Sequence, residues 1–215
     1  MPPSRVLTTE SSGDPSRIGP TFSLAALVLA VVAMTALHVL GRTLDPIRAP
    51  ISFYVHGAYG WLLPFALAAF GAAAVSLSLP GNRLRLSTRS RAALALFGAG
   101  MILTAIIPSD RWFPWEATPT WSGLVHAGAA IVAPLLLLAP MIGLARRSTR
   151  RPRAARLLLV TYVGGLLSSG VSLLAGLLLD SSPPLIGLGE RLLALGAVAW
   201  LALCARDARW VKTPA

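Results

Sequence analysis

The sequence predicts an all-α protein, an integral membrane bundle of six transmembrane helices with both termini in the cytoplasm. Three observations support this fold class. Of the 215 residues, 55% are hydrophobic and 13% are charged. The apolar residues form six long stretches, each near the length of about 20 residues that a helix needs to cross a bilayer. The basic residues collect in every second loop, which assigns those loops to one side of the membrane.

The six apolar stretches give the expected helices in chain order. They leave room for one compact membrane domain and for no sizeable soluble domain. The expected spans are Thr21–Leu40, Tyr59–Leu79, Ala92–Ile107, Thr120–Leu144, Leu157–Leu179 and Leu185–Ala205.

Residue types at the ends of the stretches justify each helix. The first stretch has the basic flank of a signal peptide, but it is long and Gly41-Arg42-Thr43 is not a small-x-small cleavage site, so we expect a retained anchor helix. The first, third and fifth helices end with an aspartate close to proline, a common stop and turn signal. The second, fourth and sixth helices end before a basic segment. The aspartates are Asp45, Asp110 and Asp180, and the basic segments are 83–91, 146–156 and 206–212.

The charge distribution predicts which side each loop faces. Fifteen of the 19 lysines and arginines lie before the first helix, in the second and fourth loops or after the last helix, and the positive-inside rule places that side in the cytoplasm. We therefore expect a multi-pass protein of the inner (plasma) membrane, with membrane lipids as partners because the basic loops can contact anionic headgroups. A nucleic-acid partner is not expected, because the basic segments lack interleaved aromatic residues that stack on bases.

The sequence outside the helices is short. Residues 1–20, rich in Ser, Pro and Gly, predict a flexible cytoplasmic tail, and residues 206–215 predict a short second tail, on either side of the six-helix domain at 21–205. The loop Arg42–Ala58 contains two prolines and several apolar residues. We expect this loop to form an ordered cap over the outer face of the bundle.

Small residues follow one face of each of the last three helices. Such stripes allow helices to pack closely in a membrane. Two of the stripes also contain an ionisable side chain, His126 or Glu190, which is thereby expected on a packed face. The stripes are Ser122, His126, Ala130 and Ala133 on the fourth helix, Thr161, Gly165, Ser169, Ser172 and Gly176 on the fifth, and Gly187, Glu190, Ala194 and Ala197 on the sixth.

Glu190 is the most informative single residue. At a rise of about 1.5 Å per residue it lies roughly one and a half turns inside the last span, where an ionisable group is costly and usually faces the bundle interior or a wet cavity. Two interpretations remain open. Glu190 either belongs to a polar site or is an interfacial carboxylate that is hydrated or paired with an arginine such as Arg191.

The outer ends of the helices suggest a polar pocket. The second, fourth and sixth helices begin there, so their positive dipole ends converge near Arg48, Arg111 and Arg191, which suits a phosphate. Because Asp45, Asp110 and Glu190 are expected in the same pocket, a zwitterionic lipid headgroup or a polar group on an apolar tail fits better than a bare anion. The expected binding residues are Asp45, Arg48, Ser52, Tyr54 and Arg191.

A catalytic version of this pocket uses acid–base chemistry. Glu190 in a low-dielectric site would act as general acid, and His126 or Asp110 would act as base. Ser52 is a conceivable nucleophile, but no G-x-S-x-G elbow surrounds it, and a serine two residues after a proline is more often a turn or cap residue.

Metal and cofactor sites are not expected. His38, His126 and Glu190 lie at similar depth, but each comes from a different helix and no H-x-x-x-H or H-E-x-x-H pair presets a metal site. A single cysteine, Cys204, rules out an intramolecular disulfide and a thiolate cluster. The sequence predicts no cofactor, and it leaves the oligomeric state open.

Three short segments carry a resemblance to a known family. They occur in the same order and at matching topological positions from the first span to the last. The segments are Leu44-Asp45-Pro46-Ile47-Arg48 with Ile51-Ser52-Phe53-Tyr54 and Gly60-Trp61, then Ile107-Pro108-Ser109-Asp110 with Gly123 and His126, then Gly187-Leu188-Gly189-Glu190-Arg191 with Trp200. The chain resembles the bacterial membrane proteins grouped as domain of unknown function 998. The resemblance implies a six-helix membrane protein, common in actinobacteria, without an activity.

The chain departs from this family's pattern at the end of the third helix. Family members tend to have Phe-Pro-Thr-Asp there, whereas this chain has Ile107-Pro108-Ser109-Asp110. The aspartate matches and the aromatic residue is missing.

Two functions from different classes follow from these observations. The first is a protein that binds a lipid or lipophilic small molecule in the outer polar pocket, or acts on it by acid–base chemistry. The alternative is a non-enzymatic structural or assembly subunit of a membrane complex, in which the same polar residues hold the helices together. Transport is a weaker candidate, because the chain has no evident inverted repeat and no helix broken at the midplane.

Overall fold

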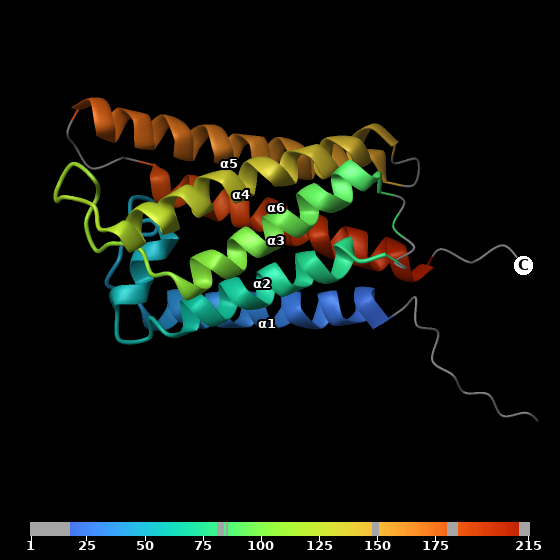
Figure 1. Ribbon diagram of the computed structural model, residues 1–215, viewed down its shortest axis with the longest axis horizontal. Coiled ribbons are helices and arrows are strands. Elements are labelled where there is room, and N and C mark those ends of the chain that lie inside the picture. Colours follow the sequence, from blue (N-terminus) through green and yellow to red (C-terminus); the bar gives the residue numbers. More distant parts are fainter. Residues whose placement is uncertain (1–17, 81–83, 85, 148–150, 180–184, 211–215) are drawn as a thin grey trace, which may run out of the picture.

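The computed structural model describes residues 18–80, 84, 86–147, 151–179 and 185–210. In this part of the chain the regular secondary structure consists of helices alone, without strands, which confirms the predicted all-α bundle (Figure 1). The elements are α1 (Ile18–Leu40), the 3-10 helix η2 (Ile51–His56), α2 (Leu62–Ser78), α3 (Thr88–Ile106), α4 (Trp121–Arg147), α5 (Pro152–Leu179) and α6 (Ile186–Trp210).

The helices have the length and composition of membrane spans. Among the described residues, α1, α3, α4, α5 and α6 are long and apolar enough to cross a membrane. α2 has 17 residues, which gives roughly 25 Å of helix against a hydrocarbon core of about 30 Å. The chain is therefore a membrane-embedded helical protein in which α2 is the shortest of the described α-helices.

Several helices extend beyond the apolar stretches that predict them. α1 begins at Ile18, so part of the expected tail at 1–20 is helical, and residues 1–17 lie outside the described part. α6 continues to Trp210 into the expected tail at 206–215, of which 211–215 also lie outside. An apolar stretch marks only the part of a helix that lies in hydrocarbon, whereas backbone hydrogen bonding continues past it.

Local sequence explains two of the early starts. α3 begins at Thr88 because Ser87 caps it, and the Ser87 hydroxyl oxygen accepts a hydrogen bond from the Ser90 N–H at 3.2 Å. α5 begins with Pro152, and proline is favoured at the first helical position because its missing N–H would be unpaired there in any case. A search for apolar stretches does not detect helix starts that are formed by polar residues or by a proline.

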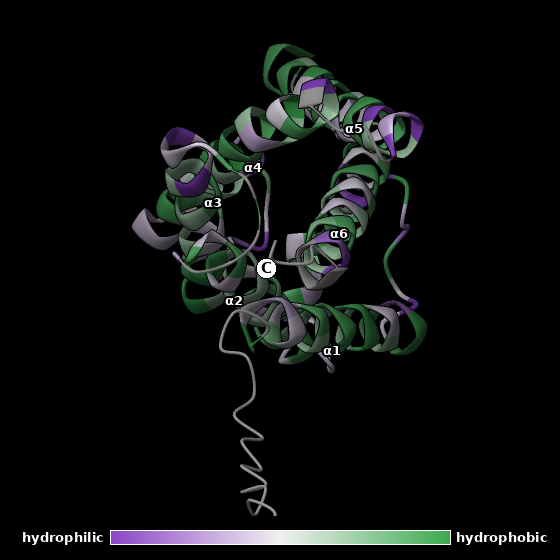
Figure 2. Cartoon of the chain, turned by 90° about the vertical axis from the view of Figure 1, so that its right-hand side faces the viewer, coloured by the Kyte–Doolittle hydropathy of each residue, from purple (hydrophilic) through white to green (hydrophobic). Residues whose placement is uncertain are grey.

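The six α-helices form a closed ring. Consecutive helices pack side by side, and α6 also packs against α1 (Figure 2). One end of the bundle carries the Arg42–Ala58 loop and the loop between α3 and α4, at the left in Figure 1. We call it the capped end, and the charge distribution predicts that it lies outside the cytoplasm. Away from this end, large buried side chains such as Phe97, Leu137, Met141 and Trp200 fill the ring.

Small residues allow α5 and α6 to pack closely. Gly165 and Gly176 of the expected stripe on α5 are buried, and a Cβ added to Gly165 would lie 2.6 Å from the backbone nitrogen of Leu193. The stripe expected on the fourth helix is packed only in part, because Ser122 and Ala130 are exposed.

Two glycines determine how closely α2 and α3 approach. A Cβ on Gly98 would lie 2.6 Å from the carbonyl oxygen of Gly71, and a Cβ on Gly71 would lie 2.5 Å from the carbonyl oxygen of Gly98. Both obstructing atoms belong to the backbone, so no side chain can move aside. The two helices can adopt this contact only with glycine at both positions, as is common where membrane helices pack closely.

We therefore expect Gly98→Ala to separate α2 from α3. The free energy of unfolding should fall by about 1–2 kcal/mol, as when a methyl group is forced into a packed interior, and the melting temperature of the detergent-solubilised protein reports the change. Gly164→Ala is the matched control, because a Cβ there meets nothing within 4 Å. Equal melting temperatures for the two variants would contradict the close contact.

Candidate functional site

The Arg42–Ala58 loop, hereafter the capping loop, packs onto the capped end of the bundle. Its 3-10 helix η2 contributes the buried side chains of Ile51 and Tyr54, which are 9% and 4% exposed. Both belong to an apolar cluster with residues of α1 and α2, among them Leu37 and Leu63. The apolar side chains of Ile51 and Tyr54 thus hold the loop against the bundle.

The capping loop also binds the first turns of α6 through its backbone. The Leu188 N–H donates to the Ile47 carbonyl oxygen at 2.9 Å. The Ile51 N–H donates to Glu190 Oε2 at 2.6 Å. Gly187, which precedes Leu188, has no room for a side chain, because a Cβ there would collide with the carbonyl oxygen of Ala49. Gly187, Leu188 and Glu190 therefore all contribute to the contact between α6 and the capping loop.

Arg191 connects the capping loop to α1. Its Nη1 donates to the carbonyl oxygens of Ala49 at 3.1 Å and Gly187 at 2.8 Å, and its Nη2 donates to the Tyr54 hydroxyl at 3.4 Å. The guanidinium carbon lies 5.8 Å from the centre of the Tyr54 ring, a cation–π distance. Its Nε donates to His38 Nε2 at 3.1 Å.

The contacts of His38 determine its tautomer. His38 Nδ1 lies 2.8 Å from the Met34 carbonyl oxygen, and a carbonyl oxygen can only accept, so Nδ1 carries the hydrogen. Nε2 is then the acceptor that Arg191 requires. We call the side chains of His38, Tyr54, Glu190 and Arg191 the polar lock, because together they join α1, the capping loop and α6.

A second polar cluster lies where α4 begins. Thr120 caps this helix, and its hydroxyl oxygen accepts from the Gly123 N–H at 3.0 Å. Asp110 accepts from the Thr120 N–H at 2.9 Å and from its hydroxyl at 2.6 Å. His126 is 6% exposed, and its Nδ1 lies 2.7 Å from the carbonyl oxygen of Ile107. The hydrogen bonds of Asp110 and His126 thus connect the segment that follows α3 to the start of α4.

The Thr120 hydrogen bonds have an electrostatic consequence. They hold the pKa of the Asp110 carboxyl below its ordinary value of 3.8, with smaller contributions from the charges of His56 and His126. A carboxyl whose folded-state pKa is depressed adds stability that is present above the unfolded-state pKa and is lost as pH falls through the folded-state pKa.

Wild-type protein should therefore lose stability on acidification between about pH 5 and pH 3, and Asp110→Asn should lose less. Asparagine keeps an oxygen that can accept from Thr120 but cannot titrate. Melting temperatures of both proteins across this range test the prediction. Parallel curves would mean that Asp110 does not contribute to the acid sensitivity.

The two loops of the capped end also touch each other. The Ser109 hydroxyl donates to the Ser52 carbonyl oxygen at 3.2 Å. The Phe53 ring lies 4.8 Å from the Phe113 ring, which stacks on Trp115 at 4.7 Å. Ser52 therefore takes part in joining the loops through its backbone, and the described contacts do not place its hydroxyl beside a base.

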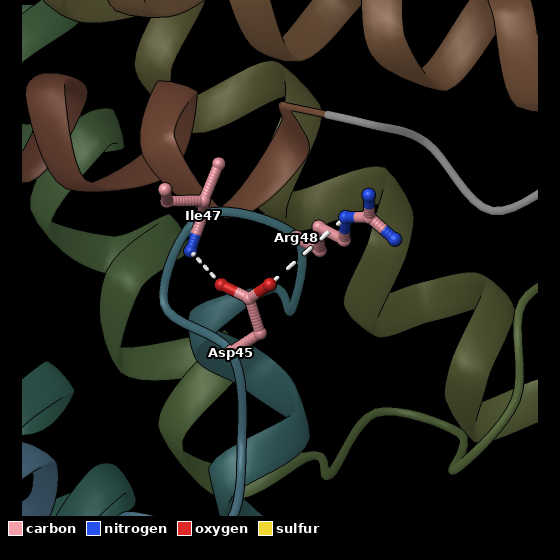
Figure 3. A network of polar contacts seen from close by, with 3 residues as sticks. All are labelled: Asp45, Ile47 and Arg48. Carbon is pink, nitrogen blue, oxygen red and sulfur yellow. Dashed lines mark hydrogen bonds and ion pairs between the residues drawn. The ribbon is translucent and has the colours of Figure 1, made fainter.

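Asp45 and Arg48 lie at the surface of the capping loop (Figure 3). Asp45 Oδ1 accepts from the Ile47 N–H at 2.8 Å, the hydrogen bond of an Asx turn. Arg48 Nε lies 3.9 Å from Asp45 Oδ2, and the two side chains are 73% and 54% exposed, respectively. The Asx turn of Asp45, rather than this exposed ion pair, presents the Ile47 carbonyl oxygen to α6.

The residues expected in one pocket thus occupy three places. Tyr54, Glu190 and Arg191 meet in the polar lock, Asp110 and His126 lie at the start of α4, and Asp45 and Arg48 lie at the loop surface. The polar lock also contains His38, which the sequence presented only as a histidine at similar depth. Among the described residues, no group of three or more His, Cys, Asp or Glu side chains could hold a metal ion.

A hollow of about 300 Å³ lies beside the capping loop. It is bordered by the end of α1, by the loop itself and by the start of the α3–α4 loop, and it shares Tyr54 with the polar lock. Its lining residues are Leu37, Leu40, Gly41, Thr43, Leu44, Phe53, Tyr54, His56, Gly57, Ala58, Tyr59 and Arg111.

Comparisons with known proteins identify a family. No curated protein and no solved structure matches the chain significantly. The sequence profile described as "Protein of unknown function (DUF998)" matches residues 24–207, from the first turns of α1 into the last turns of α6. The match includes most of every described helix and confirms the resemblance carried by the three segments. The chain belongs to the DUF998 family.

Proposed function

We propose that this protein binds a lipid or another lipophilic small molecule at its outer face, in the hollow beside the capping loop. The observation that carries the proposal is the hollow itself. Its volume of about 300 Å³ is at the lower end of the range for small-molecule sites, about 300–1,000 Å³. Its lining combines apolar side chains with a few polar groups, as binding sites of this kind do.

The position of the hollow favours a ligand from the membrane. It adjoins the last turn of α1, where Val39 and Leu40 are each 49% exposed. Because α1 is a spanning helix, we expect this exposed apolar turn to face lipid, so that a lipophilic molecule reaches the hollow from the bilayer.

The contacts of the candidate catalytic residues favour binding over acid–base chemistry. Glu190 accepts from Ile51, His126 is bonded to Ile107 and Asp110 accepts from Thr120. None of these three side chains lines the hollow. A general acid or base must lie within hydrogen-bond reach of the reacting atom.

The alternative is a non-enzymatic structural or assembly subunit of a membrane complex. One observation favours it: each side chain of the polar lock has a partner within the chain. On this alternative the lock shapes the capped end for another protein, and the hollow holds no specific ligand.

The test compares two threonines of the capped end. Both are exposed, but Thr43 lines the hollow and Thr118 does not. Native mass spectrometry of the detergent-purified full chain should detect a discrete lipophilic molecule on wild type and on Thr118→Trp. Thr43→Trp, which fills the hollow, should lose it. A wild type without a specific molecule, or a Thr43→Trp variant that keeps it, would refute the proposal and favour the structural alternative.

A further inference from the structure

We infer that the molecule bound in the hollow carries an anionic head, a phosphate or a carboxylate, which Arg111 recognises, on an apolar chain. The inference rests on the proposed function and adds the chemical class of the ligand. The sequence favoured a zwitterionic head instead. The structure favours an anionic head because the described carboxylates of the capped end do not line the hollow.

Arg111 supplies the charge in the lining of the hollow. Among the described residues that line it, Arg111 is the one Lys, Arg, Asp or Glu side chain. Among the described residues, Arg111 has no hydrogen-bond or ion-pair partner, and its side chain is exposed. A guanidinium without a partner offers five N–H donors in a fork that matches phosphate and carboxylate oxygens.

The carboxylates expected in the same pocket have other partners. Asp45 accepts from Ile47 within its own turn, and Glu190 accepts from Ile51 on the α6 side of the loop. Asp110, the neighbour of Arg111 in sequence, is held by two hydrogen bonds from Thr120. A zwitterionic head would need one of these groups to face its cation, and none lines the hollow.

The rest of the lining suits an apolar chain. Leu37, Leu40, Leu44 and Phe53 contribute apolar surface, and the exposed last turn of α1 leads from it into the membrane. Trp112 follows Arg111 and is 60% exposed, as expected for an aromatic residue at the membrane–water interface. The hollow thus offers a cation at headgroup depth and an apolar surface beside it, which together fit an anionic amphiphile.

The test titrates the full chain in detergent with four defined probes, followed by native mass spectrometry. Oleate carries a carboxylate, phosphatidylglycerol a phosphodiester, phosphatidylcholine a zwitterionic head and monoolein a neutral head. Wild type should bind oleate or phosphatidylglycerol at least about tenfold more tightly than the last two, and Arg111→Gln should remove about that factor. The anionic probe that responds identifies the head.

Two further variants make the result specific. Arg111→Lys keeps the charge and should recover part of the affinity. Arg42→Gln removes an exposed charge from the capping loop, does not change a residue that lines the hollow, and should bind like wild type. If all four probes bind wild type and Arg111→Gln alike while Thr43→Trp still blocks them, the anionic head is wrong and the binding site stands. If Thr43→Trp blocks no probe, the proposed function itself fails.

Discussion

Arg191→Leu is expected to detach the capping loop from α6 and α1. The substitution removes every donor that reaches Ala49, Tyr54 and His38 and leaves the Ala49 carbonyl oxygen and His38 Nε2 without this partner. The free energy of unfolding should fall by about 3 kcal/mol, the upper value for hydrogen bonds to a charged group. The melting temperature in detergent measures this loss.

Hydrogen exchange separates a local release from general destabilisation. In Arg191→Leu the amides of Ile51 and Leu188, which donate across the loop contact, should exchange faster than amides in the middle of α2 or α3. Arg48→Leu is the control, because its side chain is 73% exposed. Unchanged protection of Ile51 and Leu188 in Arg191→Leu would show that the loop stays attached to α6 without the Arg191 side chain.

Arg191→Lys tests whether the fork of the guanidinium matters. A lysine ammonium has three donors at one point, whereas Arg191 directs Nε, Nη1 and Nη2 to partners in three different directions. Lysine should therefore recover only part of the stability lost in Arg191→Leu. Full recovery would mean that a single contact accounts for the effect.

The helices could be predicted from the sequence because membrane insertion imposes a strong pattern. A span needs a long apolar stretch, and no other feature of this chain produces one. The helix ends were less predictable, since they depend on caps such as Ser87 and on a proline start at Pro152, which lie outside the apolar stretches. Helix α2 was predicted longer than it is, because Tyr59 and Trp61 are apolar enough to extend the stretch although they lie in a turn.

Individual residues of the site could be predicted from the sequence, but their hydrogen-bond partners could not. Depth and residue type identified Glu190 as a residue that needs a partner, and Arg191 was expected as its partner or as a binding residue. Their partners depend on the path of the capping loop, which brings the Ile51 N–H and the Ala49 carbonyl oxygen to α6, and no sequence period encodes such a path. His126 was grouped with Glu190 because both lie at similar depth, but depth does not give the rotation of a helix, and His126 faces Ile107.

Glu190 itself offers the sharpest test of whether the site is catalytic or structural, through a pair of substitutions. Glutamine keeps a side-chain oxygen that can accept from the Ile51 N–H, but it cannot exchange a proton. Leucine is of similar size and can do neither. If Glu190 docks the loop, Glu190→Gln should lose little stability, whereas Glu190→Leu should lose about 3 kcal/mol, because it leaves a buried donor unpaired.

If Glu190 is instead a general acid, Glu190→Gln and Glu190→Leu should have the same effect on activity. Glutamine and leucine would then abolish turnover of the bound molecule equally, whatever their effects on the melting temperature, because neither donates a proton. Melting temperatures and the mass of the bound molecule, measured for both variants beside wild type, distinguish the two roles. The 2.6 Å contact between Glu190 and the Ile51 amide leads us to expect that Glu190→Gln resembles wild type in stability and in its bound molecule. A Glu190→Gln variant that folds normally but accumulates an unconverted molecule would instead restore Glu190 as an acid, with the loop contact as the means of positioning it.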